Sequence, residues 1–289
     1  MIIGSDKGRV IENIQAAVKT KDFNRKVETG DPELTQRQKT AIAVNHMKNR
    51  DTLEYRLCNI CARAIEDTAA RFINKDTKVV GLKKLSEIDG GAIVTSNHFN
   101  PIDTTIALTA VKKAGYKRLY IVSQETNLAM KGWIGFLMKH TDIIPITDDT
   151  RYVKKYLEPE IKSRLESGQL VLIYPEQEMW FNYRKPRPFK RGAYLYAAKN
   201  NAPIISCFTE IVDMPQMETE EFHRTKYILH ILDPIFPSPE KSVRENSIEM
   251  MNKDFLQKKA AYEKAYKRKL DFNFESSDIA GWSTNSKHS

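Results

Sequence analysis

The chain has 289 residues and a formal net charge of +9 at pH 7, a length that fits one large domain or a domain with an appendage. Its apolar runs stay well short of the ~20 residues that span a bilayer. Residues 1–8 are too short and too polar for a signal peptide. We therefore expect a cytoplasmic protein and exclude the disulfide-rich and membrane-spanning classes.

The cysteines do not indicate a disulfide framework or a metal site. Only Cys58, Cys61 and Cys207 are present, too few for a stapled fold. Cys58 and Cys61 lack a second cysteine pair, and His46 lies too far upstream for the usual zinc spacing. The glycines match neither a phosphate-binding loop nor a dinucleotide fingerprint. We expect no metal and no bound cofactor.

The basic charge suits a polyanionic partner, such as nucleic acid, anionic lipid or a phosphorylated substrate like coenzyme A. A basic surface that only keeps the protein soluble explains the charge equally well. Motifs of nucleic-acid-binding domains are absent from the sequence. Nucleic acid is therefore not an expected partner, and charge alone does not choose among the others.

Residues 1–75 are predicted to form an N-terminal helical region. Apolar residues recur there at spacings of four, three and four, as Leu53, Leu57, Ile60 and Ala64. This period is typical of one face of an amphipathic helix. Asp51 or Thr52 precedes it as a suitable N-cap.

Residues 76–236 alternate between apolar strands and helices. The predicted strands are Thr77–Gly81, Ala92–Ser96, Arg118–Ser123, Ile143–Thr147, Gln169–Tyr174, Pro203–Val212 and Lys226–Leu232. The predicted helices are Pro101–Ala114, Asn127–His140, Arg151–Ser167 and Arg191–Asn200. This alternation predicts an α/β core with a mixed, mostly parallel sheet flanked by helices.

Residues 237–272 are predicted to contain a long C-terminal helix, roughly Pro239–Leu270. Its expected buried stripe is Ile248, Met251, Phe255, Tyr262 and Tyr266. The opposite face is basic, with Lys258, Lys259, Lys264, Lys267, Arg268 and Lys269. Such a face is either solvated or in contact with an anionic surface. The Ser- and Asn-rich residues 273–289 are expected to be disordered.

The most informative residues are His98 and Asp103. They follow the apolar strand 91–95, where Asn100 is expected to cap a helix that opens at Pro101. Capping and the helix dipole alone explain an acid at position 103. They do not explain a histidine at the carboxyl end of a strand, the place where ligands bind in open α/β sheets.

A carboxylate bonded to one imidazole nitrogen leaves the other nitrogen free to accept a proton near neutral pH. Asp103 would thus hold His98 as a general base, the role that the acid plays in a serine triad. The sequence has no Gly-x-Ser-x-Gly elbow. The substrate is therefore expected to supply the hydroxyl, and backbone amides near the helix start to stabilise an oxyanion.

Two further segments are candidates for substrate contact. Glu176 follows the most apolar strand, and it either binds substrate hydroxyls, orients a basic group or belongs to a surface turn. The next stretch, 184–191, carries five cations and no acid: Arg184, Lys185, Arg187, Lys190 and Arg191. Such a loop grips phosphate or is simply solvated.

An apolar cluster on the predicted helix 127–140 has two interpretations. Its members are Trp133, Ile134, Phe136, Leu137 and Met138. Core packing is the default, and the lining of an acyl-chain site is the alternative.

Taken in order, these blocks resemble the glycerolipid acyltransferase family, of the bacterial 1-acylglycerol-3-phosphate acyltransferase type, over residues 75–235. The most specific match is Asn97 to Asp103, which fits the family's Asn-His and His-x4-Asp signature. The segments 132–147, 174–176, 189–192 and 202–205 resemble the blocks that follow. The resemblance implies that His98 is the general base and that Asp103 orients it.

The third block departs from the family pattern. Where the family has Gly-Thr-Arg, this chain has Gln177, Glu178 and Met179. The family's arginine there helps to bind the acceptor phosphate. The cations of the 184–191 loop are the candidates to replace it.

The resemblance implies an O-acyltransferase that moves a fatty acyl group from acyl-CoA or acyl-carrier protein to a hydroxyl of a lysophospholipid-like acceptor. Asn97, Asn100, Glu176, Arg184, Arg187, Lys190 and Arg191 are the expected substrate-binding residues. The enzyme is expected to bind an anionic membrane peripherally, on the inner face of the cell membrane. The alternative is an inactive family member that binds lipid or nucleic acid through its basic surface.

Overall fold

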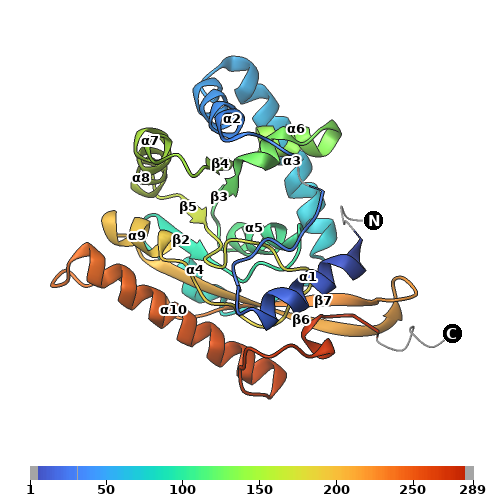
Figure 1. The fold of residues 1–289 in the computed structure, drawn as a ribbon. Helices are drawn as coiled ribbons and strands as arrows, with labels where there is room; N and C mark the ends of the chain where they lie inside the picture. The colour runs from blue at the N-terminus through green and yellow to red at the C-terminus, as the bar shows by residue number, and fades with distance from the viewer. Residues whose placement is uncertain (1–5, 31, 284–289) are drawn as a thin grey trace.

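The computed structural model of the protein describes residues 6–30 and 32–283 (Figure 1). Within these residues one sheet has the strand order β1-β7-β6-β2-β5-β3-β4. The strands are β1 (Lys78–Val80), β2 (Ala92–Thr95), β3 (Leu119–Gln124), β4 (Ile143–Ile146), β5 (Leu170–Leu172), β6 (Ile204–Met217) and β7 (His223–Ile231). Each overlaps a predicted strand, although β6 ends five residues later and β7 begins three residues earlier than predicted, and the predicted fold class is confirmed.

The sheet is parallel except at one pair. β2 pairs in parallel with β5 and β6, β3 pairs in parallel with β4 and β5, and β1 pairs in parallel with β7. Only the β6–β7 pair is antiparallel among the described strands, because a short turn rather than a helix joins these two. This order brings the carboxyl ends of β2 and β5 side by side.

Alternation along the central strands builds a core on each face of the sheet. Val94 and Leu172 face one core, whereas Ile93 and Val171 face the other, as the period of two in a strand requires. The first core is covered by α3 (Leu53–Ile73), α4 (Leu82–Ser86) and α5 (Asp103–Lys113). The second is covered by α2 (Gln36–Asn49), α8 (Glu158–Glu166), α9 (Gly192–Lys199) and α10 (Val243–Tyr266).

Two predicted helices are interrupted. The predicted helix 127–140 is a 3₁₀ turn, η1 (Glu125–Ala129), followed after an extended link by α6 (Gly132–His140). The predicted helix 151–167 consists of α7 (Thr150–Tyr152), a wider π turn, η2 (Val153–Leu157), and then α8. Pro159 at the start of α8 lacks an N–H and crowds the preceding turn, which accounts for the widening.

The helix after β2 starts two residues later than predicted. The expectation of an Asn100 cap with Pro101 in the first turn is wrong, because α5 begins at Asp103. Asn100 is restrained from helical angles by the proline that follows it. A tight turn forms instead, in which the Asp103 N–H donates to the Asn100 carbonyl at 2.9 Å.

The N-terminal region is helical as predicted, with α1 (Lys7–Lys19), α2 and α3. Thr52 caps α3 through its side chain. The predicted apolar stripe of α3 does not face the core, however. Leu53, Leu57 and Ile60 are 74%, 57% and 62% exposed. The face that α3 buries is made of smaller residues, among them Asn59, Ala62 and Ala70.

The C-terminal helix is shorter than predicted, and its buried face differs from the prediction at Lys258 and Ile248. It begins at a capping box formed by Ser242 and Glu245 and ends where Lys267 takes a left-handed conformation. Lys258, expected on the solvated face, is fully buried against Asp254, with 2.8 Å between Nζ and Oδ2. Ile248, expected in the buried stripe, is exposed. Tyr262 of the predicted stripe is buried as expected, and the Asp254–Lys258 ion pair is buried on the same helix.

The expected disorder of residues 273–289 is wrong for the described part. Residues 276–278 form a 3₁₀ turn, η3 (Ser276–Asp278), and Ile279 and Ala280 are buried. Ile279 bridges to Tyr183, which ties this segment to the loop after β5. Residues 284–289 lie outside the described residues.

Candidate functional site

His98 and Asp103 form a hydrogen-bonded pair at the carboxyl end of β2. His98 Nδ1 lies 2.8 Å from Asp103 Oδ2. A carboxylate only accepts hydrogen bonds, so Nδ1 carries a proton, and in the neutral ring Nε2 is then the acceptor. The His98 side chain is 20% exposed and thus reachable, whereas Asp103 is buried beneath it.

The Asp103 carboxylate accepts three further hydrogen bonds. The backbone N–H groups of Phe99 and Asn100 donate to Oδ2 at 2.9 and 3.2 Å, and the Tyr174 hydroxyl donates to Oδ1 at 2.6 Å. The backbone amides of Phe99 and Asn100 are therefore engaged by Asp103 and are not free to stabilise an oxyanion.

Asn97 and Asn100 form hydrogen bonds that hold the strands and loops of the site together. Asn97 joins β2 to β6, because its amide donates to the Thr209 carbonyl at 3.0 Å and accepts from the Thr209 N–H at 2.8 Å. Asn100 donates to Asn182 at 3.2 Å between the two side chains. Both predicted binding residues are buried and hold loops in place rather than reaching toward open solvent.

Glu176 and Arg187 form a buried ion pair directly behind His98. Arg187 Nη2 lies 2.9 Å from Glu176 Oε2, and the Arg187 backbone N–H donates to Oε1 at 3.1 Å. The His98 N–H donates to the same Glu176 carboxylate at 3.3 Å. Burial lowers the pKa of Arg187, and Glu176 opposes that shift. Of the alternatives for Glu176, the structure realises the one that orients a basic group.

The remaining donors of Arg187 are also engaged. They reach the backbone carbonyls of Phe23, His98 and Glu178. Arg187 also lies over the ring of Trp180. Because Arg187 is buried and bonded on every side, the expectation that it grips a substrate phosphate is wrong.

The other cations of the 184–191 loop divide into two groups. Arg184 pairs with Asp213 at 2.5 Å, and Lys185 pairs with the buried Asp278 at 2.9 Å. Lys190 and Arg191 are exposed at the start of α9. The Lys190 N–H donates to the Pro175 carbonyl at 2.8 Å, which keeps this end of the loop next to Glu176. Lys190 and Arg191 are the sequence-predicted cations that remain accessible.

The third block takes a distinctive backbone path. Gln177 has φ of 67°, a left-handed conformation that favours glycine, and glycine is what the family pattern has there. The Glu178 carboxylate accepts from the Gln124 amide at 2.7 Å. This hydrogen bond joins the block to the end of β3.

The segment after α1 contacts the loop that follows β5, which the sequence did not predict. The Asn24 side chain donates to the Glu176 and Pro188 carbonyls. The Trp180 indole donates to the Arg25 carbonyl at 2.9 Å. These partners are separated by about 150 residues of sequence, so no local pattern signals the contact.

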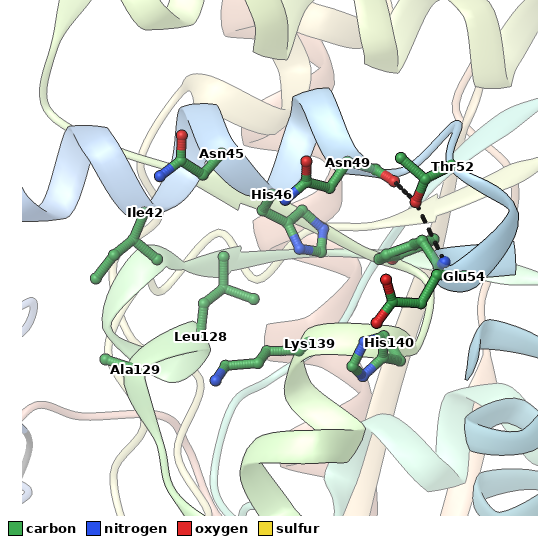
Figure 2. Close-up of a pocket in the computed structure, with 11 residues that line it drawn as sticks. Ile42, Asn45, His46, Asn49, Thr52, Glu54, Leu128, Ala129, Lys139 and His140 are labelled. Atoms are coloured by element: carbon green, nitrogen blue, oxygen red, sulfur yellow. Dashed lines mark hydrogen bonds between the residues drawn. The ribbon is translucent and has the colours of Figure 1, made fainter. Parts of the chain in front are cut away.

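A pocket of about 510 Å³ lies between α2, the start of α3, η1 and α6. In Figure 2, His46 of α2 points toward the same space as Leu128, Lys139 and His140. Burial lowers the pKa of His46 to about 4, so its ring stays neutral. The pocket lining contains none of the sequence-predicted site residues.

The apolar cluster of α6 is half-buried apart from Trp133. Trp133 is exposed, and Phe136 lines a second, adjacent pocket with Met130 and His140. The default interpretation of this cluster is therefore wrong for Trp133.

Within residues 6–30 and 32–283, no group of three or more His, Cys, Asp or Glu side chains gathers in a way that would hold a metal ion. Over the same part of the chain, the helices are too short or too polar to cross a bilayer.

Comparison with known proteins gives one family. Residues 76–210 match the family model described as Acyltransferase. Among solved structures, the 1-acyl-sn-glycerophosphate (LPA) acyltransferase PlsC from Thermotoga maritima aligns with 80% of this chain and 96% of its own, at 16% identity and a TM-score of 0.48. No curated protein sequence matches the chain.

The Glu176–Arg187 pair predicts a sharp contrast between two arginines of one loop. Arg187→Ala leaves a buried carboxylate unpaired, and we expect a loss of about 3–5 kcal/mol in the free energy of unfolding. Arg191→Ala, at an exposed position, is the matched control and should change it by less than about 0.5 kcal/mol. Urea unfolding followed by circular dichroism measures both. Equal midpoints for the two variants would contradict the buried pair.

Proposed function

We propose, on the premise that residues 76–210 match the acyltransferase family model, that the protein moves an acyl group from a thioester to a hydroxyl of a lysolipid-like acceptor, with His98 as the general base. The thioester is acyl-CoA or acyl-carrier protein. The single observation that carries this role is the hydrogen bond from His98 Nδ1 to Asp103.

The reaction follows from that tautomer. His98 Nε2 takes the proton from the acceptor hydroxyl, and the oxygen attacks the thioester carbonyl carbon. The carbon–sulfur bond then breaks, and the departing thiolate takes the proton back from the imidazolium. Asp103 keeps the ring oriented and offsets the charge that appears on it.

The acceptor head group approaches past the exposed end of the basic loop. Arg184, Lys185 and Arg187 are each held by a carboxylate, which leaves Lys190 and Arg191 as the loop cations that solvent reaches. We assign any phosphate contact of the acceptor to these two residues. Glu176 accepts a hydrogen bond from the His98 backbone N–H and so helps to position the base.

The base role is tested by His98→Ala in the purified protein. Loss of a positioned general base costs about 10²–10⁴-fold in rate, so we expect a drop of this size in thiol release from acyl-CoA in the presence of a lysolipid mixture. Thiol release, with mass spectrometry of the acylated product, measures it.

The matched control for that experiment is His230→Ala. His230 also bonds a carboxylate, with 2.8 Å between Nε2 and Glu210 Oε2, but it lies on β7. This variant should keep the wild-type rate. Near-normal transfer by His98→Ala would contradict the mechanism. A wild-type protein that binds lipid but releases no thiol with any acceptor would favour the inactive, lipid-binding alternative.

We further propose that α3 lies against the membrane that holds the acceptor. Leu53, Leu57 and Ile60 share one helix face and are exposed to solvent. A helix face of this kind inserts shallowly into the headgroup boundary. Cations flank it, among them Arg56, Arg71 and Lys75, which are exposed. The combination suits an anionic lipid surface.

Leu57→Glu combined with Ile60→Glu places two acids on this face. Because apolar burial and attraction to anionic lipid are both lost, we expect sedimentation with phosphatidylglycerol vesicles to fall at least about tenfold. Leu256→Glu is the control, since Leu256 is 60% exposed on α10, which runs along the lower edge of the molecule in Figure 1, away from α3. Equal vesicle binding by the two proteins would exclude α3 as the contact.

A further inference from the structure

We propose that Tyr174 is a positioning residue of the catalytic base: its hydroxyl tunes the charge of the Asp103 carboxylate, and its ring fixes the plane of the His98 imidazole. This role rests on the proposed function, because it concerns the base of that reaction. It assigns a task to a side chain that neither donates to nor accepts from the imidazole itself.

The first observation is a close stack. The rings of His98 and Tyr174 have centroids 3.9 Å apart and planes inclined by 13°. The stack follows from the topology, because β2 and β5 are adjacent and the Ile173 N–H donates to the Val94 carbonyl at 2.9 Å. With one face covered, the imidazole cannot swing about its χ1 bond without losing this contact.

The second observation is the hydrogen bond from the same residue to Asp103. The Tyr174 hydroxyl lies 2.6 Å from Asp103 Oδ1, while Oδ2 receives His98 Nδ1. One carboxylate thus connects the phenol and the imidazole through different oxygens. Tyr174 therefore reaches the base twice, through the ring face and through the carboxylate.

The phenol remains a donor at every working pH. Burial and the neighbouring Asp103 carboxylate raise the pKa of Tyr174 well above its usual range. The hydroxyl therefore withdraws charge from Asp103 continuously. With less charge available, the carboxylate stabilises the imidazolium less than a carboxylate without this donor does.

Other titratable groups near the pair do not supply this effect. Glu176 and Arg187 contact the His98 backbone, but they neutralise each other as an ion pair. Burial raises the pKa of Cys207, on β6, to about 12. Burial also raises the pKa of Tyr227, on β7, whose ring contacts Phe99. Both stay uncharged across the range in which an imidazole titrates.

The test compares Tyr174→Phe with Tyr227→Phe, a buried tyrosine beside the site whose described hydroxyl contact is Thr225 rather than Asp103. The readout is the pH profile of kcat/KM for thiol release. For Tyr174→Phe we expect the acidic limb to move upward by about half a pH unit, with about a three- to tenfold loss on the plateau. For Tyr227→Phe the limb should stay in place.

A role in folding alone predicts a different result. A variant that is partly unfolded lowers every rate by one factor and leaves the limb where it was. A second variant guards against failure of Tyr174→Phe to fold: 3-fluorotyrosine installed at position 174 is a stronger donor. With this residue the limb should move downward, opposite to the phenylalanine variant.

The outcomes separate the two proposals. An unmoved limb in the Tyr174 variants, together with an inactive His98→Ala protein, overturns the tuning role and leaves the base intact. Near-normal transfer by His98→Ala overturns the base and the role of Tyr174 with it. Limb shifts of opposite sign in the two Tyr174 variants, with none in Tyr227→Phe, confirm the inference.

Discussion

One carboxylate organises the site. Asp103 accepts hydrogen bonds from the imidazole of His98, from the backbone of Phe99 and Asn100, and from the hydroxyl of Tyr174. These contacts hold the turn between β2 and α5 together. They also orient the His98 side chain, which is the partly exposed member of the pair. Because a buried carboxylate needs all its donors, the fold of the turn and the chemistry of the base depend on the same group.

Parts of the chain far from this turn hold it in place. Glu176 and Arg187 form hydrogen bonds with the backbone of His98. Arg187 also donates to the Phe23 carbonyl, which lies in the segment after α1. The C-terminal segment adds a bridge from Ile279 to the loop after β5. Both ends of the described chain thus stabilise a site that lies in its middle. Three of the five cations of the 184–191 loop form ion pairs within the protein.

The sequence predicted the features that rest on local or periodic patterns, namely the strands and the His98–Asp103 pair. Apolar runs located the central strands, because strands buried on both faces read as continuous apolar stretches, and a spacing of five residues joined His98 to Asp103. It did not predict that Arg187 and Lys258 are buried, because a cation shows its partner only in three dimensions. The apolar face of α3 was recognised, but periodicity does not say whether such a face meets the core or the outside.

The proposed reaction depends on Asp103 holding His98 with Nε2 bare and ready to accept a proton. The most direct test is ¹⁵N NMR of the imidazole nitrogens in histidine-labelled protein at pH 8, with the His98 signals assigned by comparison with His98→Asn. We expect a protonated Nδ1 and an unprotonated Nε2. A proton on Nε2 with a bare Nδ1 would contradict it.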